Sequence, residues 1–156
     1  MHEICSTLNR FRPSVPLILR VVIGGLFIWH GIDKFDVGID MIETMFDSWG
    51  VPAPGVAAPV TAVLEIVGGI ALVFGIGTRV FAMALSAVMI GAIIYVKADL
   101  GVISSQPMPG AELDLAMLAG LIAVIISGPG RFSIDDKLGL EPAEADRMRE
   151  PVLAGR

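Results

Sequence analysis

The chain has 156 residues, of which 54% are hydrophobic and only 17% are charged, and its formal net charge is −5. Long apolar runs exclude a disordered chain or a disulfide scaffold and argue against a soluble enzyme. The acidic balance, without any Lys/Arg cluster, excludes a nucleic-acid partner and leaves the lipid bilayer as the first partner. Two histidines and the single Cys5 are too few for a disulfide or for a zinc or haem site, so we expect no intrinsic cofactor and no metal.

Four apolar segments predict an all-α membrane protein, built as a four-helix transmembrane bundle. They run over residues 15–32, 57–76, 80–96 and 113–127. Each is near the roughly 20 residues that cross about 30 Å of hydrocarbon. No small-residue cleavage site follows the first segment, so we interpret it as a retained helix rather than a signal peptide. The chain then divides into an N-terminal arm over 1–13, a membrane domain over 14–138 and a polar tail over 139–156.

The stretch after the first span predicts an amphipathic helix that lies in the membrane interface. Apolar and acidic residues each recur there every three or four positions, so they occupy separate faces of a helix. The apolar face holds Phe35, Ile39, Ile42, Phe46 and Trp49, and the polar face holds Asp36, Asp40, Glu43 and Asp47. Trp49 would anchor the helix at headgroup depth. Alternatively, the helix packs as a lid on the bundle. Glycines and prolines between positions 50 and 55 then end it.

The positive charges predict that both termini are cytoplasmic. In a four-span chain, only Lys34 and Lys97 lie on the side opposite to the termini. Eight residues lie on the same side as the termini: Arg10, Arg12, Arg79, Arg131, Lys137, Arg147, Arg149 and Arg156. Because cytoplasmic loops carry the excess of Lys and Arg, this asymmetry sets the orientation.

Ionisable residues inside the spans are costly unless they are paired or hydrated, so each is a candidate functional residue. Glu65 carries most weight, because it lies near the middle of the second span between apolar neighbours. On the first helix Arg20, His30 and Lys34 share one broad face, and either Arg20 or His30 could reach Glu65. Glu112 enters from the outer end of the fourth span. We therefore expect a polar pocket of His30, Lys34, Glu65 and Glu112 that binds a ligand or relays protons, with Arg20 as a further member.

Simpler structural roles compete with these interpretations. Buried ion pairs in a bundle can serve only to fix helix register. Arg20, Lys34 and Lys97 lie near helix ends and can extend their charged groups to the interface. We interpret Lys97, Asp99 and Asp114 as interfacial residues.

The fourth span ends at a Gly-Pro-Gly sequence over residues 128–130. Ser133 and Asp136 follow with the spacing of a capping box, which predicts a short surface helix. From residue 141 onward the chain is polar and of mixed charge, and we expect a frayed tail.

These residues together resemble the DoxX-like family of small membrane proteins, over about residues 14–138. The matching pieces are, in order, Arg20, residues 27–35 (FIWHGIDKF), 50–52 (GVP), 65–69 (EIVGG), 75–79 (GIGTR), Glu112 and 128–135 (GPGRFSID). The resemblance implies a four-helix bundle in the bacterial inner (plasma) membrane. It also implies a link to redox chemistry, since the family takes its name from a membrane subunit of thiosulfate:quinone oxidoreductase, and links to oxidative stress through partner proteins. Asp114 departs from the family pattern, in which an apolar residue or Pro is usual.

We therefore expect an integral membrane subunit of a redox-linked assembly, with a quinone or a similar amphipathic small molecule bound in the polar pocket. Glu65 and His30 would hydrogen-bond its carbonyl or hydroxyl groups and relay protons, while electrons would come from a protein partner or a diffusible ligand. Two alternatives stay open. One is a small transporter or lipid- or metabolite-handling protein, and the other is a structural or assembly subunit of a membrane complex. Whether the chain catalyses a reaction of its own is also left open.

Overall fold

The computed structural model describes residues 11–104 and 110–140, and all regular structure within them is helical. The elements are, in order, the 3-10 turn η1 (Arg12–Ser14), α2 (Val15–Val37), α3 (Ile39–Ser48), α4 (Pro54–Phe74), α5 (Thr78–Gly91), the π-helical η2 (Ala92–Val96), α6 (Glu112–Ser127) and α7 (Ile134–Lys137). The predicted all-α class is therefore confirmed for this part of the chain. Cys5, most of the predicted arm and most of the predicted tail lie outside the described residues.

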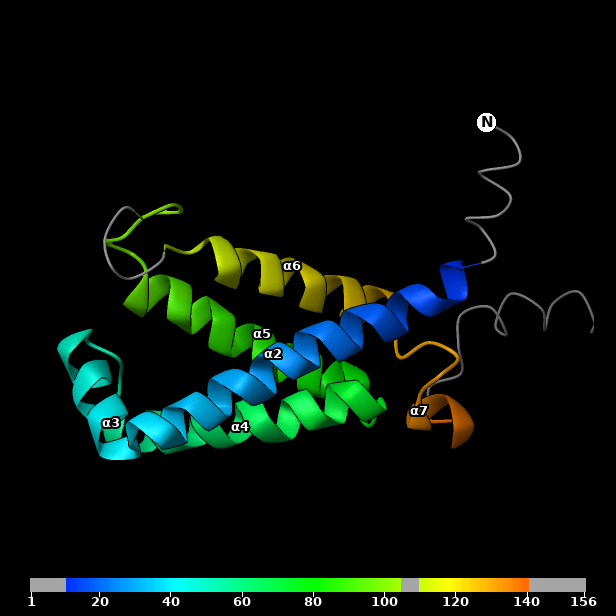
Figure 1. Cartoon of the computed structure of the whole chain (residues 1–156), viewed down its shortest axis with the longest axis horizontal. Coiled ribbons are helices and arrows are strands. Elements are labelled where there is room, and N and C mark those ends of the chain that lie inside the picture. Colours follow the sequence, from blue (N-terminus) through cyan, green and yellow to red (C-terminus); the bar gives the residue numbers. More distant parts are fainter. Residues whose placement is uncertain (1–10, 105–109, 141–156) are drawn as a thin grey trace, which may run out of the picture.

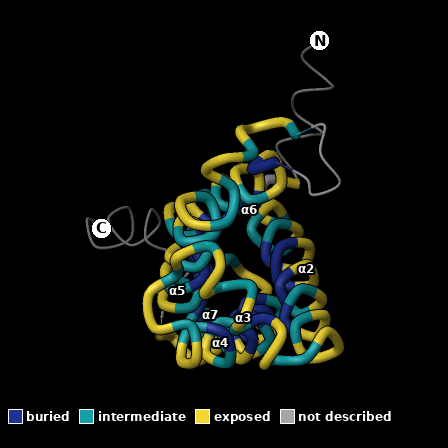
Figure 2. Tube along the Cα trace, turned by 90° about the vertical axis from the view of Figure 1, so that its left-hand side faces the viewer, coloured by how far each residue is buried: buried dark blue, intermediate teal, exposed yellow. Residues whose placement is uncertain are grey.

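Two antiparallel helix pairs form the bundle, with α2 packed along α4 and α5 packed along α6 (Figure 1). α3 and the residues that follow η2 lie at one end of the bundle, which we name the α3 end. The first turn of α2 and the short α7 lie at the opposite end, the α7 end. Figure 2 shows that the exposed segments lie on the outside of the bundle and that the buried segments face neighbouring helices.

Three helical segments in the described part of the chain are long and apolar enough to cross a membrane: Val15–Val37, Pro54–Phe74 and Thr78–Val96. Their outer surfaces are apolar, as contact with lipid requires. The side chain of Trp29 is 73% exposed, for example, and that of Val80 is 63% exposed. α6 has only 16 residues, but it runs beside α5 back towards the α7 end (Figure 1). A fourth crossing by α6 and an interfacial position for α3 remain predictions.

The junction between α2 and α3 differs from the predicted pattern. α2 continues to Val37, five residues past the predicted end, and Gly38 then breaks the helix with a φ of +99°. Phe35 and Asp36 therefore belong to α2, and their assignment to the amphipathic helix is wrong. The three-to-four residue periodicity continues through Gly38, which hid the break. The remaining helix packs on α4 and buries Ile42.

Glycines allow the backbones of α2 and α4 to pack closely together. A Cβ atom on Gly24 would lie 2.6 Å from the carbonyl oxygen of Gly69, and one on Gly31 would lie 2.8 Å from that of Ala62. Real Cβ atoms do not approach this closely, so only glycine fits at either position. Gly25, by contrast, has no atom within 4 Å of the place where its Cβ would be.

The core between the helices is apolar, and it lies between the two ends of the bundle. Its fully buried members come from α2, α4, α5 and α6, and they are Phe27, Leu72, Ala82, Leu85, Leu121 and Val124.

At the α7 end, the buried carboxylate of Asp135 connects α7 with the start of α5. It accepts hydrogen bonds from the backbone N–H of Gly77 (2.8 Å), the backbone N–H of Thr78 (2.9 Å) and the hydroxyl of Thr78 (2.8 Å). We name this group, Asp135 with Gly77 and Thr78, the Asp135 clamp. The hydroxyl of Ser133 accepts from the N–H of Asp136 at 3.0 Å, which confirms the predicted helix cap. The clamp therefore fastens α7 to the first turn of α5.

Candidate functional site

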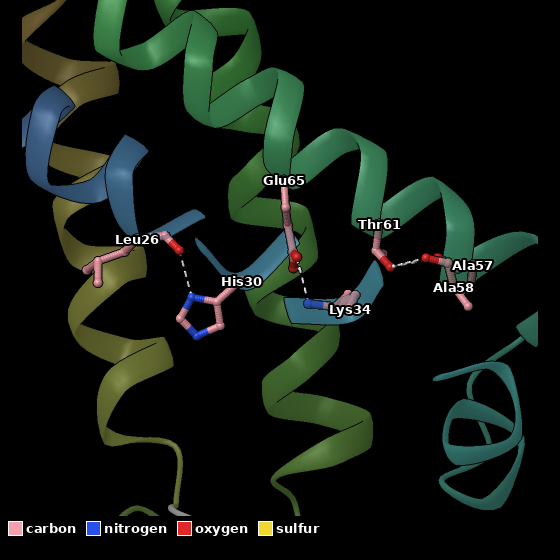
Figure 3. A network of polar contacts seen from close by, with 7 residues as sticks. All are labelled: Leu26, His30, Lys34, Ala57, Ala58, Thr61 and Glu65. Carbon is pink, nitrogen blue, oxygen red and sulfur yellow. Dashed lines mark hydrogen bonds and ion pairs between the residues drawn. The ribbon is translucent and has the colours of Figure 1, made fainter. Parts of the chain in front are cut away.

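Glu65 lies in the middle of α4, faces inward and is only 2% exposed. Lys34 of α2 donates a hydrogen bond from Nζ to Glu65 Oε2 across 2.6 Å (Figure 3). Gly31, one turn earlier on α2, explains why Lys34 lies so close to Glu65. A Cβ at Gly31 would collide with Ala62 and Ile66, so α2 contacts α4 immediately on either side of Glu65. The side chain of Lys34 is 18% exposed, so the ion pair is partly open on the lysine side.

His30 lies one turn before Lys34 on the same broad face of α2, and its ring does not point towards the ion pair (Figure 3). Its Nδ1 is 2.8 Å from the carbonyl oxygen of Leu26. Because a carbonyl can only accept, Nδ1 must carry the proton, and Nε2 of the neutral ring is then the basic atom. His30 makes no hydrogen bond with Glu65, but its charge acts on that carboxylate. We name Glu65, Lys34 and His30 the Glu65 site.

Arg20 does not belong to this site, and the expectation that it reaches Glu65 is wrong. Its guanidinium is fully buried and donates to the carbonyl oxygens of Leu72 (3.3 Å) and Phe132 (2.9 Å). The reason is register. α2 crosses α4 where Gly24 meets Gly69, so Arg20, one turn nearer the α7 end, lies level with Leu72. Arg20 thus joins α2, α4 and the segment that leads into α7.

Glu112 also lies outside the site, which corrects its predicted place in the pocket. It is the first residue of α6 and is exposed, whereas Asp114 is half-buried and feels the charges of Lys97 and His30. Two positions along a helix differ by about 200°, so the two carboxylates cannot face the bundle together. Asp114 was expected to be interfacial. The signal for its inward position is the helical spacing to the buried face of α6, which holds Met117, Leu121 and Val124.

Asp135 was also absent from the candidate residues. The capping pattern of Ser133 and Asp136 drew attention to its neighbours, and a carboxylate on a short surface helix is usually exposed. Its hydrogen bonds to residues nearly 60 positions earlier make it a structural fastener at the α7 end.

The Glu65 site offers hydrogen-bond donors and acceptors within an apolar bundle. The ammonium of Lys34 can only donate, the carboxylate of Glu65 can only accept, and Nε2 of His30 accepts when the ring is neutral. Such a set can hold a carbonyl or hydroxyl headgroup and can exchange protons with it. Within residues 11–104 and 110–140, no group of three or more His, Cys, Asp and Glu side chains is placed to hold a metal ion.

Comparison with known proteins identifies the family. The DoxX family model matches residues 15–98. The chain is 38% identical over 134 residues to "Uncharacterized membrane protein Rv3486" of Mycobacterium tuberculosis, a match that covers 81% of this chain and 82% of the relative. It is 34% identical over 119 residues to "Putative oxidoreductase CatD" of Bacillus subtilis, covering 76% and 83% respectively.

A more distant relative is "Inner membrane protein YphA" of Escherichia coli, 27% identical over 127 residues, which covers 80% of this chain and 90% of the relative. No solved structure matches the chain. The family model spans more than half of the chain, and the mycobacterial relative aligns along most of both proteins. The resemblance seen in the sequence is therefore confirmed, and the chain belongs to the DoxX family of membrane proteins.

Proposed function

We propose that this protein is an integral membrane subunit of a redox-linked assembly, and that it binds a quinone or a similar amphipathic small molecule at the Glu65 site. The observation that carries the proposal is the buried ion pair of Lys34 and Glu65, with His30 one turn away, beside the apolar core of the bundle. Ionisable groups at such depth are costly, and they mark ligand sites or proton relays by default. The name of the Bacillus subtilis relative supports the redox link.

The donors and acceptors of the site fit a quinone headgroup. Lys34 has three N–H groups, and Glu65 uses one of them, so the ammonium can also donate to a headgroup carbonyl. Glu65 and His30 Nε2 would accept from a headgroup hydroxyl and hold the protons. A bound quinone would supply two-electron, two-proton chemistry. An apolar groove also lies on α4 at the level of Glu65, but on the outer face of the helix, where Val60, Val63 and Val67 are exposed.

We place the protein in the bacterial inner membrane, with four crossings and both termini in the cytoplasm. The excess of Lys and Arg on the side of the termini supports this orientation. Two relatives in Escherichia coli that are named inner membrane proteins support the location. In this arrangement the α3 end faces away from the cytoplasm. The electrons are delivered or removed by a protein partner in the membrane complex.

Binding of short-chain benzoquinones and naphthoquinones to the purified protein in nanodiscs tests the proposal. Glu65→Gln and His30→Ala should each weaken binding by about tenfold, because each removes a hydrogen bond worth about 1.4 kcal/mol. Glu112→Gln is the matched control, since it neutralises an exposed carboxylate outside the site. Binding that is indifferent to both site variants would remove the quinone assignment.

The two alternative functions predict different results. A small transporter or lipid-handling protein would show solute uptake in proteoliposomes or a co-purified lipid, either of which should be lost in Glu65→Gln. An assembly subunit would co-purify with a stable partner and tolerate Glu65→Gln, because its ion pair would serve only to fix the register of α2 and α4.

A further inference from the structure

The ionisable groups around Glu65 are distributed unequally along the bundle. Towards the α7 end, Phe27, Leu72, Leu85 and Leu121 are fully buried and apolar. The polar groups on that side are themselves buried and hydrogen-bonded: Ser86 donates to Ala82, Arg20 donates to Leu72, and the Asp135 clamp lies beyond them. Towards the α3 end, Lys34, His30, Lys97 and Asp114 are only partly buried. The partly exposed ionisable groups near Glu65 in the described structure therefore lie towards the α3 end.

Helix register places Asp114 level with His30 along the bundle. A Cβ on Gly120 of α6 would collide with Ile23 of α2, so these two positions are level. The two helices run in opposite directions (Figure 1). Moving six or seven residues from this contact towards the α3 end therefore reaches His30 on α2 and Asp114 on α6. The electrostatic coupling of Asp114 to both His30 and Lys97 agrees with this placement.

His30 is held in the form that can carry a proton between the two carboxylates. Its Nδ1 proton is fixed on the carbonyl oxygen of Leu26, so Nε2 is the atom that gains and loses a proton. In Figure 3 the ring lies away from Lys34, towards the side of α2 on which α6 runs. His30 is also coupled electrostatically to both Glu65 and Asp114, which agrees with a ring within range of both carboxylates.

We propose that Asp114, Lys97 and His30 form a proton-exchange route that connects Glu65 with the aqueous phase at the α3 end, and that no such route reaches Glu65 from the α7 end. A proton from water is taken up at Asp114, passes to Nε2 of His30 and is delivered to the carboxylate of Glu65; release reverses these steps. Lys34 is hydrogen-bonded to Glu65, and Lys97 acts electrostatically on Asp114. Glu112, near Asp114, is exposed and lies beside the route. The role of this route in quinone chemistry rests on the proposed function, but the route itself does not require a bound quinone.

Carbodiimide modification of Glu65 in proteoliposomes tests the route without any quinone. Dicyclohexylcarbodiimide dissolves in the bilayer and reacts with protonated carboxyl groups, and mass spectrometry identifies the modified residue. The pH is set separately on the two sides of the membrane, and protease treatment of a terminal tag gives the orientation. Lowering the pH on the α3 side should speed the modification of Glu65 several-fold, whereas lowering it on the α7 side should not change the rate.

Variants test whether protons reach Glu65 through Asp114 and His30 or directly from nearby water. Asp114→Asn and His30→Ala should each reduce the response of Glu65 to pH on the α3 side, and Glu112→Gln should leave the response unchanged. Size-exclusion profiles confirm that each variant is folded. A response to pH on the α7 side, or equal responses in wild type and in Asp114→Asn, would overturn the route. If the protein bound no quinone but Glu65 modification still responded to pH on the α3 side only, the proposed ligand would be wrong and the route would stand.

Discussion

The carboxylate of Asp135 caps the first turn of α5 through Thr78, a residue 57 positions earlier in the chain. Because Asp135 is 2% exposed, the N–H groups that it satisfies cannot turn to water when it is removed. This contact explains how a four-residue helix remains docked on the bundle.

Replacing Asp135 should therefore destabilise the protein. Asp135→Ala leaves two backbone N–H groups and one hydroxyl without their acceptor, and we expect a loss of about 2 kcal/mol in the free energy of unfolding. Thermal unfolding in detergent measures the change. Lys137→Ala is the control, because that side chain is exposed on the same short helix. Equal stability of the two variants would show that the clamp contributes nothing.

The ion pair of Lys34 and Glu65 should show strong energetic coupling. Lys34→Met leaves a carboxylate buried without a partner, at a cost of about 3 kcal/mol. Glu65→Gln should cost less, because Lys34 is partly exposed and can move its ammonium group towards the aqueous phase. The double variant should be more stable than Lys34→Met alone. A double-mutant cycle on unfolding temperatures measures the coupling, and additive effects would contradict the pairing.

Two adjacent glycines of α2 should respond differently to the same substitution. Gly24→Ala pushes a methyl group against the backbone of Gly69, and we expect it to cost about 1–3 kcal/mol. Gly25→Ala places the methyl group in open space and serves as the control. Unfolding temperature in detergent distinguishes them. If both variants behaved alike, the close approach of α2 to α4 would be incorrect.

Terminal tags test the predicted orientation. Epitopes at residue 1 and at residue 156 should both resist protease added to spheroplasts, and both should be cleaved in inverted vesicles. Cleavage of both tags from outside would reverse the orientation. Tags on opposite sides would leave an odd number of crossings, so that α6 would not span the membrane.

Composition and apolar run length were enough to predict the all-α class and the approximate positions of the long helices. Those features depend on local sequence, and the backbone must form helices wherever it contacts lipid. The break at Gly38 escaped prediction, because one glycine does not disturb the periodicity on either side of it. The conclusion about Phe35 failed for that reason.

The candidate site was predicted less completely, because it depends on how the helices align. Glu65 and Lys34 were both identified from their depth, but their pairing required the crossing point at Gly31. Arg20 was considered as one possible partner of Glu65, and its true acceptor on Phe132 escaped prediction because Phe132 is 112 residues away and lies outside the predicted spans. The choice of Glu112 over Asp114 followed from depth and from the family resemblance, and it neglected the direction in which each side chain leaves α6.

The unequal lengths of the helices have a consequence for the surrounding lipid. α2 has 23 residues and is about 35 Å long, whereas α6 has 16 residues and is about 24 Å long. If α6 spans a hydrocarbon layer about 30 Å thick, the layer must thin by several ångströms along that flank. Annular lipids would then be compressed on one side of the molecule only. Such one-sided mismatch favours short-chain lipids beside α6, or a neighbouring protein that relieves the deformation.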